Sequence, residues 1–173
     1  MIAPKDFIET LRAGGIEFFA GVPDSLLKNL CAYITDNLSR ENNIIAANEG
    51  NAVGLAAGYH LATGKVGGVY MQNSGEGNIV NPLLSLMDAD VYKMPLLLII
   101  GWRGEPGVHD EPQHVKQGKV TLSLLETMGV PYAVLGEEWE MQVDEALDTI
   151  NKTNGIYALI VRKGTFDAYA LQK

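Results

Sequence analysis

The sequence has only one cysteine in 173 residues, and this scarcity excludes an internal disulfide bond. Cys31 is surrounded by Leu30, Ala32 and Tyr33, an apolar setting that favours a packed core thiol over a catalytic nucleophile. Proteins without disulfides are typical of reducing compartments, so we expect a cytoplasmic location.

Long apolar segments are absent as well. The longest, residues 95–100, is far shorter than the roughly 20 apolar residues that a membrane-spanning helix requires. Lys5, Asp6 and Glu9 interrupt the opening segment, so no secretory signal peptide is expected there. Both absences predict a protein with no membrane partner.

Basic residues are also in short supply. There are 13 Lys and Arg residues against 21 Asp and Glu residues, which gives a formal net charge of −8. This balance argues against nucleic acid or an anionic membrane as the main partner, because both attract basic surfaces. Three histidines and one cysteine provide no zinc-ligand set at a recognised spacing, so no metal site is expected in this chain. The sequence also lacks a Walker-type Gly-Lys-Ser/Thr motif and a Gly-x-Ser-x-Gly motif.

One phosphate-binding signal is present but incomplete. Residues 74–78, Ser-Gly-Glu-Gly-Asn, follow a predicted strand and open a predicted helix, as a phosphate-cradling turn does. The dinucleotide fingerprint also requires a third glycine and an acidic residue about 20 positions later. Val80 and an apolar stretch around residue 97 stand there instead, so a nucleotide-binding domain is disfavoured.

Helix and strand signals alternate along the whole chain. Strands are predicted at residues 16–20, 44–47, 66–72, 96–100, 132–135 and 156–161. Helices are predicted at residues 4–13, 25–38, 49–63, 77–87, 119–128 and 139–151. The strands are continuous apolar runs, which is typical of a parallel sheet covered by helices on both faces. We therefore expect a single α/β domain over residues 1–173, with a doubly wound, mostly parallel sheet of about six strands.

A carboxylate stands at the start of an otherwise apolar helix. Residues 44–47 read as a short buried strand, Asn48 is a good N-cap, and Glu49 then falls in the first helical turn. The rest of the helix to residue 63 is rich in Ala, Val, Leu and Gly. An acid in that setting needs a partner, and binding a ligand is one explanation. The alternative is a first-turn acid that complements the helix dipole.

Polar and glycine-rich residues concentrate in four loops that leave the predicted strands. These loops are residues 21–25, 48–50, 72–78 and 101–118. In a doubly wound sheet, ligands bind beyond the carboxyl ends of the strands, so we expect the site in these loops.

The last of these loops carries an unusual share of basic residues. Residues 102–118 are expected to be a long loop, kept ordered by Trp102, Val108 and Val115. The same loop carries the candidate anion-binding residues Arg103, His109, His114 and Lys116. The alternative is a solvated loop whose charges pair among themselves.

Five motifs extend over most of the chain. They are GVPDSLLK at 21–28, NEGNAVGLAAGYHLATGK at 48–65, MQNSG at 71–75, GWRGEPG at 101–107 and DEPQH at 110–114. Together they resemble the N-terminal, pyrimidine-binding half of the phosphonopyruvate decarboxylase family, whose members use thiamine diphosphate and Mg²⁺. The sulfopyruvate decarboxylases are similar and are often divided into two short subunits.

The resemblance implies decarboxylation of a small anionic 2-oxo acid, with phosphonopyruvate giving phosphonoacetaldehyde and carbon dioxide. Glu49 matches the glutamate that hydrogen-bonds to the aminopyrimidine ring of the cofactor and promotes loss of the thiazolium proton. The other expected cofactor-binding residues are Gln72, Asn73, Ser74, Gly75 and Asn78.

Further roles follow from the same resemblance. His114 is expected to contact the substrate or supply a proton, and Arg103, His109 and Lys116 are expected to bind the substrate. Asp24 is expected to relay protons, although capping the following helix explains it equally well. His60 is expected to be a satisfied packing residue.

The sequence departs from the family pattern in two respects. It has no match to the Gly-Asp-Gly and downstream Asn that hold Mg²⁺ and the diphosphate in the second half of these enzymes. We therefore expect a diphosphate-binding domain or beta subunit as partner, in a homo- or hetero-oligomer, with residues 49–63 offering a packing face. Glu76 stands where a small or apolar residue is expected. A sulfopyruvate decarboxylase alpha subunit and a non-catalytic partner-binding subunit are the alternatives.

Overall fold

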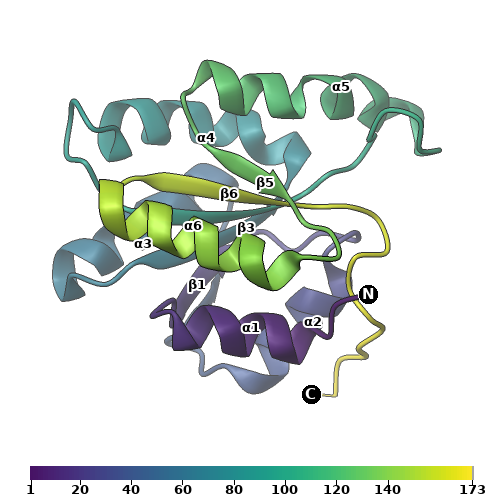
Figure 1. Ribbon diagram of the computed structural model, residues 1–173, viewed down its shortest axis with the longest axis horizontal. Helices are drawn as coiled ribbons and strands as arrows, with labels where there is room; N and C mark the ends of the chain where they lie inside the picture. The colour runs from purple at the N-terminus through teal and green to yellow at the C-terminus, as the bar shows by residue number, and fades with distance from the viewer. Residues whose placement is uncertain (173) are drawn as a thin grey trace.

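A computed structural model describes residues 1–172 of the chain. Six strands form one sheet in the order β2-β1-β3-β4-β6-β5, and every neighbouring pair is parallel (Figure 1). The strands are β1 (Phe18–Gly21), β2 (Asn43–Ile45), β3 (Gly67–Gln72), β4 (Leu96–Gly101), β5 (Tyr132–Val134) and β6 (Ile156–Val161). This topology confirms the predicted doubly wound α/β fold.

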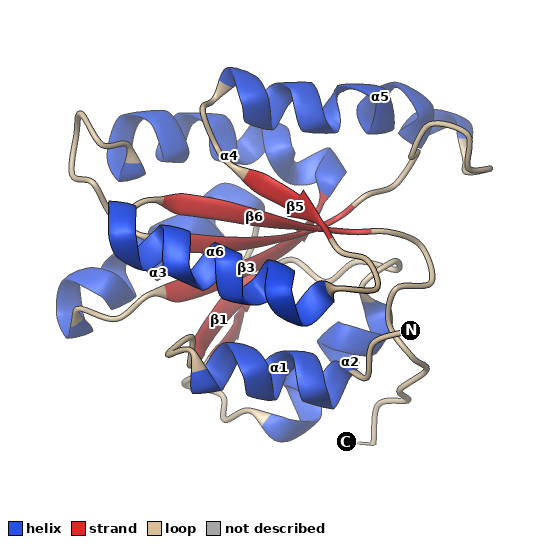
Figure 2. Cartoon of the chain, viewed as in Figure 1, coloured by secondary structure: helices blue, strands red, loops and turns tan. Residues whose placement is uncertain are grey.

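Helices cover both faces of the sheet, as Figure 2 shows. They are α1 (Pro4–Ala13), α2 (Lys28–Asn37), α3 (Glu49–Thr63), η1 (Asn73–Gly75), α4 (Glu76–Pro82), η2 (Leu83–Met87), α5 (Pro112–Thr127) and α6 (Trp139–Thr153). One apolar core joins α1, α2 and α6 to the sheet, and a second core joins α3, α4 and α5 to the opposite face. The central strand β4 is buried along its whole length because it lies between both cores.

Local signals explain where several helices begin and end. Pro4 stands in the first turn of α1, where its missing N–H leaves no hydrogen bond unmade. The Asn48 side chain accepts a hydrogen bond from the backbone N–H of Asn51 at 2.9 Å and caps α3 as predicted. Gly64 ends α3 in the left-handed conformation, with φ at 72°.

The loop predicted at residues 102–118 is shorter than expected, because helix α5 begins at Pro112 rather than near residue 119. Proline at the first helical position has a backbone angle that already suits a helix, so the helix starts there. The expectation that Val108 and Val115 are buried is also wrong, since both side chains are exposed. His114 and Lys116 therefore lie on a helix, and only Trp102 is buried as expected.

Two other predicted elements differ from the structure. Strand β2 is not buried: it is an edge strand, and Ile45 is 61% exposed. Helix α2 begins at Lys28 instead of residue 25, because Asp24 accepts hydrogen bonds from the N–H groups of Leu26 and Leu27 and holds a turn there. The helix predicted at residues 77–87 is not uniform, because α4 changes to a π-helical turn directly after Pro82.

The scarce cysteine lies in the core. Cys31 is a free, buried thiol, and burial raises its pKa to about 11, so it stays protonated and unreactive at neutral pH. No helix within residues 1–172 is long and apolar enough to cross a membrane.

Candidate functional site

Hydrogen bonds tie together the loops that leave the carboxyl ends of β1, β2, β3 and β4. The Asn78 amide, beyond β3, donates to the Glu49 carboxylate, beyond β2, at 2.7 Å. Arg103, beyond β4, donates from Nη1 to Ser25 Oγ, beyond β1, at 2.7 Å. The candidate site residues therefore meet at one edge of the sheet, where open α/β sheets bind ligands.

Glu49 lies in the first turn of α3 and is only 9% exposed. Its Oε2 atom accepts the hydrogen bond from Asn78 Nδ2, and Oε1 accepts none from any described residue. One carboxylate oxygen is thus fixed by the protein, while the other is available to a group outside the chain.

Gly75 packs directly against the Glu49 carboxylate. A Cβ atom at position 75 would overlap the carboxyl carbon and oxygen of Glu49, so only glycine fits the present arrangement. The neighbouring side chains of Gln72 and Ser74 are hydrogen-bonded to each other. The turn between β3 and α4 is therefore shaped around Glu49.

Asn73 differs from its predicted role, because its side chain is fully buried and already occupied by the protein. Its amide donates to Arg103 O and Thr121 Oγ1, both at 2.8 Å, and its Oδ1 accepts from Arg103 N at 3.1 Å. Its backbone carbonyl also accepts from Gln117 Nε2 at 2.9 Å. Asn73 fixes the loop after β4 and α5 to the turn after β3, and its side chain offers no free group to a cofactor.

Glu76 is a second buried carboxyl group beside this turn, and it has no solvent exposure. Its Oε2 lies 3.4 Å from Gln117 Nε2, and within the described residues its Oε1 has no hydrogen-bond partner. Burial raises the pKa of Glu76 to about 8, although contacts with Gln117 and Thr121 act in the opposite direction. Glu76 is therefore mostly neutral at pH 7, and only its departure from the family motif marked it in the sequence.

Arg103 was predicted to bind an anionic substrate, but an acid of its own loop already neutralises it. Its Nε and Nη2 atoms donate to the two carboxylate oxygens of Asp110 at 2.8 and 2.5 Å. This two-point pairing holds the pKa of Asp110 well below its usual range and raises that of Arg103. This ion pair joins the two ends of the loop between β4 and α5.

The other predicted substrate-binding residues take no part in the Arg103–Asp110 ion pair. His109 is exposed in the loop, while half-buried His114 and exposed Lys116 lie on the first turns of α5. Within residues 1–172, these three side chains form no hydrogen bond or ion pair, so they are free to meet a ligand or partner.

Asp24 is buried below the turn after β1, and its Oδ2 accepts from Leu26 N at 3.0 Å and Leu27 N at 3.3 Å. Burial raises the pKa of Asp24, and these hydrogen bonds together with Arg103 partly offset that effect. Asp24 therefore orders the turn that precedes α2. The predicted capping of a helix from residue 25 is not seen, because α2 begins at Lys28 and no described side chain caps it.

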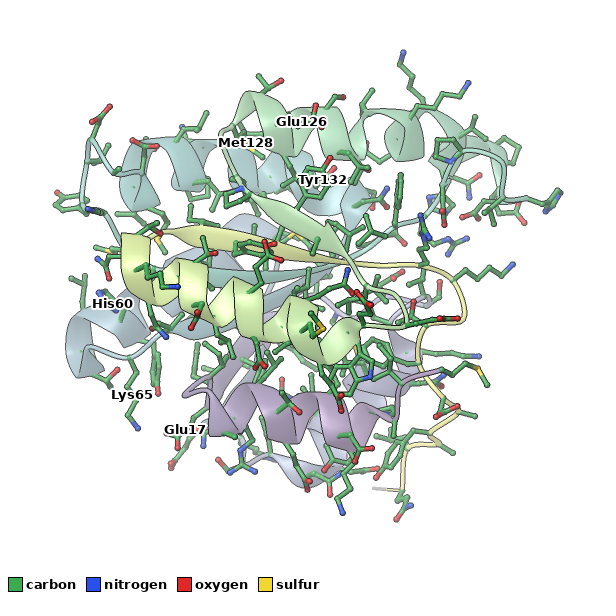
Figure 3. The ribbon with its side chains drawn as sticks, in the orientation of Figure 1. Glu17, His60, Lys65, Glu126, Met128 and Tyr132 are labelled. Carbon is green, nitrogen blue, oxygen red and sulfur yellow. The ribbon has the colours of Figure 1, made fainter. Side chains whose placement is uncertain are left out.

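His60 is remote from this edge of the sheet. Its Nδ1 lies 3.1 Å from the carbonyl oxygen of Lys65, and Lys65 forms an ion pair with Glu17. Figure 3 shows these three residues together at the left, near the amino ends of β1 and β3. His60 is thus a satisfied structural residue.

No group of three or more His, Cys, Asp or Glu side chains within residues 1–172 is arranged to hold a metal ion. Comparisons with known sequences bear on the chemistry of the site. A family model described as thiamine pyrophosphate enzyme, N-terminal TPP binding domain, matches residues 1–125.

Similar proteins include two phosphonopyruvate decarboxylases. The chain is 35% identical over 141 residues to one from Streptomyces viridochromogenes and 38% identical over 136 residues to one from Streptomyces hygroscopicus. Each match covers 78% of this chain and 33% of the relative, so the chain spans about a third of their length. It is also 33% identical over 132 residues to sulfopyruvate decarboxylase subunit alpha of Methanococcus maripaludis, with 76% of both chains covered.

Proposed function

Because this chain belongs to the thiamine pyrophosphate enzyme family, we propose that it is the pyrimidine-binding part of a thiamine diphosphate-dependent 2-oxo acid decarboxylase. The proposed substrate is phosphonopyruvate, which would yield phosphonoacetaldehyde and carbon dioxide. The observation that carries this proposal is Glu49, a buried acid at a helix N-terminus with one oxygen fixed by Asn78 and the other free.

The arrangement around Glu49 suits a flat ring with hydrogen-bonding nitrogens. The free Oε1 of Glu49 can hydrogen-bond to a ring nitrogen, and the absence of a side chain at Gly75 lets the carboxyl group lie close to the turn after β3. Gln72, Ser74 and Asn78 supply further polar groups at the same turn. When bound, thiamine diphosphate supplies the carbanion chemistry of decarboxylation, while the protein orients the reactants and controls protons.

The residues of this chain have separate proposed tasks. Asn78 fixes the direction of the Glu49 carboxyl group, so that Oε1 is held at a constant position for a hydrogen bond to the cofactor. Buried Asp24 orders the turn after β1 and is the proposed proton relay, and burial raises its pKa above the ordinary value of an aspartate. His114 is proposed to contact the substrate or deliver a proton to it, with His109 and Lys116 nearby in the chain.

A partner is proposed to complete the site. The diphosphate and Mg²⁺ would be held by a second domain or a beta subunit, and the alpha-subunit name of the M. maripaludis relative supports this division. Helix α3 offers a surface for close packing, because Gly54 and Gly58 are exposed, and a Cβ atom added at either position would meet no described atom outside the local helix backbone within 4 Å. A homo- or hetero-oligomer would follow.

Two alternatives have specific support. Sulfopyruvate is the second candidate substrate, because the match to the sulfopyruvate decarboxylase alpha subunit covers similar shares of both chains. A non-catalytic subunit that only binds a partner is the third reading, supported by the unexpected acid Glu76 beside the cofactor turn.

Co-purification from the source organism tests the partner first. We expect a diphosphate-binding chain or domain to accompany this chain, and the assembly to decarboxylate phosphonopyruvate faster than sulfopyruvate. The reverse preference would establish the sulfonate alternative. An assembly that binds thiamine diphosphate but decarboxylates neither acid would favour the non-catalytic subunit.

The substitution Glu49→Gln tests the residue that carries the proposal. Glutamine keeps the size of the side chain and its contact with Asn78 but removes the titratable oxygen. We expect turnover of the assembled enzyme to fall by about 10²–10⁴-fold, the range typical of lost acid–base function. The thermal midpoint should remain unchanged, whereas near-normal turnover would remove Glu49 from the mechanism.

A further inference from the structure

A pocket of about 330 Å³ lies between the loops that follow β1, β4 and β6. Its apolar wall is formed by Leu26, Trp102, Val108 and Phe166, while Ser25 and several charged side chains line the rest. Because Ser25 follows Asp24 directly and Arg103 contributes to the wall, the pocket adjoins the candidate site. Nothing in the proposed roles of Glu49 or His114 uses it.

The acids of this pocket are already neutralised. Asp110 pairs with Arg103, and Glu105 pairs with Arg162 through a 2.9 Å contact between Oε1 and Nε. Lys28 and Lys163 also line the pocket, and neither has an ion-pair partner among the described residues. The pocket therefore carries a local excess of two positive charges in a chain of net charge −8.

Hydrogen bonds fix the walls around the two lysines. Trp102 Nε1 donates to Gly118 O at 2.8 Å, which anchors the indole ring to α5. Asn29 Nδ2 donates to Phe166 O at 3.4 Å and connects α2 to the segment after β6. The pocket shape is thus set by the protein before any ligand arrives, which lowers the entropy lost on binding.

We propose that this pocket binds the phosphonate or sulfonate group of the substrate between Lys28 and Lys163. The inference deepens the proposed function and rests on it for the identity of the substrate, since both candidates carry a tetrahedral oxyanion as their second acidic group. The two lysine ammonium groups supply the positive charge for the oxyanion. Arg103 cannot supply it, because its guanidinium group already forms an ion pair with Asp110. Ser25 accepts from Arg103 and keeps its own hydroxyl proton to donate.

Charge predicts which oxyanion binds more tightly. A phosphonate can carry a second negative charge and a sulfonate cannot, so two lysines favour the phosphonate. The carbon bonded to the phosphonate or sulfonate group would contact the indole ring of Trp102. The fluorescence of Trp102 would therefore report binding.

The test uses the full chain with Trp139→Phe, which leaves Trp102 as the only tryptophan. Methylphosphonate and methanesulfonate are titrated at constant ionic strength while Trp102 fluorescence is recorded. We expect saturable binding, tighter for methylphosphonate, and a Kd at least tenfold higher after Lys28→Gln or Lys163→Gln, as loss of a charge-assisted hydrogen bond implies. Lys119→Gln, an exposed lysine on α5, is the matched control and should change the Kd less than twofold.

Equal losses in the control variant, or no loss in the two pocket variants, would overturn the inference. The binding assay needs neither cofactor nor partner, so its result is independent of the proposed enzyme activity. In the assembled enzyme, Lys28→Gln and Lys163→Gln should raise KM for phosphonopyruvate at least tenfold. They should leave kcat/KM for pyruvate unchanged, because pyruvate has no phosphonate group for the two lysines to bind. An assembly inactive on every 2-oxo acid would overturn the proposed function, whereas normal KM values in active variants would overturn only this inference.

Discussion

Glu76 is an acid that the fold keeps away from water. Its carboxyl group has no solvent exposure, and its Oε1 has no partner among the described residues. Gln117 and Thr121 contact it but do not balance the loss of hydration, so the pKa is raised to about 8. The protein therefore takes up a proton at this position when it folds at neutral pH.

The uptake of that proton makes stability depend on pH. The carboxyl group of Glu76 titrates near 4.5 when unfolded and near 8 when folded, so the folded state binds more protons between these values. The free energy of unfolding should fall by about 4 kcal/mol as the pH rises from 4.5 to 8, and Glu76 should add almost no further loss above about pH 9. Urea unfolding between pH 5 and 9 measures this slope.

Glu76→Gln should remove that part of the pH dependence, because glutamine has no proton to lose. The variant should be more stable than the parent above pH 7 and should approach it near pH 5. Glu137→Gln, at an exposed glutamate, is the control and should leave the slope unchanged. Parallel curves for the parent chain and Glu76→Gln would mean that Glu76 is ionised in the folded protein.

At the scale of elements, the junction between η1 and α4 determines where the Glu49 carboxyl group lies. Gly75 ends η1 against that carboxyl group, while Gly77, two residues later in α4, has open space around it. The backbone angle of Gly75 is ordinary, with φ at −81°, so a side chain there is resisted only by the contact with Glu49.

The substitution Gly75→Ala should therefore displace the Glu49 carboxyl group. We expect about a hundredfold loss of turnover in the assembled enzyme, the scale of effect that a misplacement of about 1 Å can produce. Gly77→Ala should leave turnover within twofold and stabilise α4 by up to about 1 kcal/mol, because alanine is the better helix former. Similar turnover in both variants would show that the Glu49 position is not limiting.

The sequence predicted most elements where the signal is local. Pro4, Asn48 and Gly64 mark the ends of α1 and α3, and the continuous apolar run of β4 marks a central strand. The exposure of β2 could not be read in this way, because it depends on the strand order. The start of α5 was missed because Pro112 stands among glycine, proline and charged residues, a composition typical of loops.

The sequence predicted the location of the candidate site but not the contacts between its residues. The rule for doubly wound sheets predicted which loops meet, and Glu49 stood out as an acid on an apolar helix. The pairing of Arg103 with Asp110 and the burial of Asn73 depend on how the loop after β4 folds over α5. No periodicity or spacing in the sequence encodes those contacts.

At the scale of the whole molecule, the segment after β6 binds the helical layer of α1 and α2 together. Phe166 is buried and packs edge-to-face on Phe7 of α1, with ring centroids 5.1 Å apart. Backbone hydrogen bonds join Ile2 to both Thr165 and Asp167. The segment also forms one wall of the pocket that contains Lys163.

Removing the Phe166 ring should destabilise the whole domain. Phe166→Ala is expected to lower the free energy of unfolding by about 3–5 kcal/mol, the range for a buried phenylalanine whose site cannot collapse. Leu171→Ala, at a side chain that is 55% exposed, should change it by less than about 0.5 kcal/mol. Denaturant unfolding of the parent chain, Phe166→Ala and Leu171→Ala measures both changes in the free energy of unfolding. Equal stabilities of the parent chain and Phe166→Ala would mean that the segment around Phe166 is not part of the cooperative folding unit.

The strand order has a consequence for synthesis on the ribosome. Strand β4 pairs with β3 on one side and with β6 on the other, and β6 ends at Val161. The centre of the sheet therefore cannot close until the chain has been translated to residue 161, and until then one edge of β4 is open to other nascent chains. Parallel sheets with such distant pairings fold slowly, so this domain should depend on chaperones that shield β4 during translation.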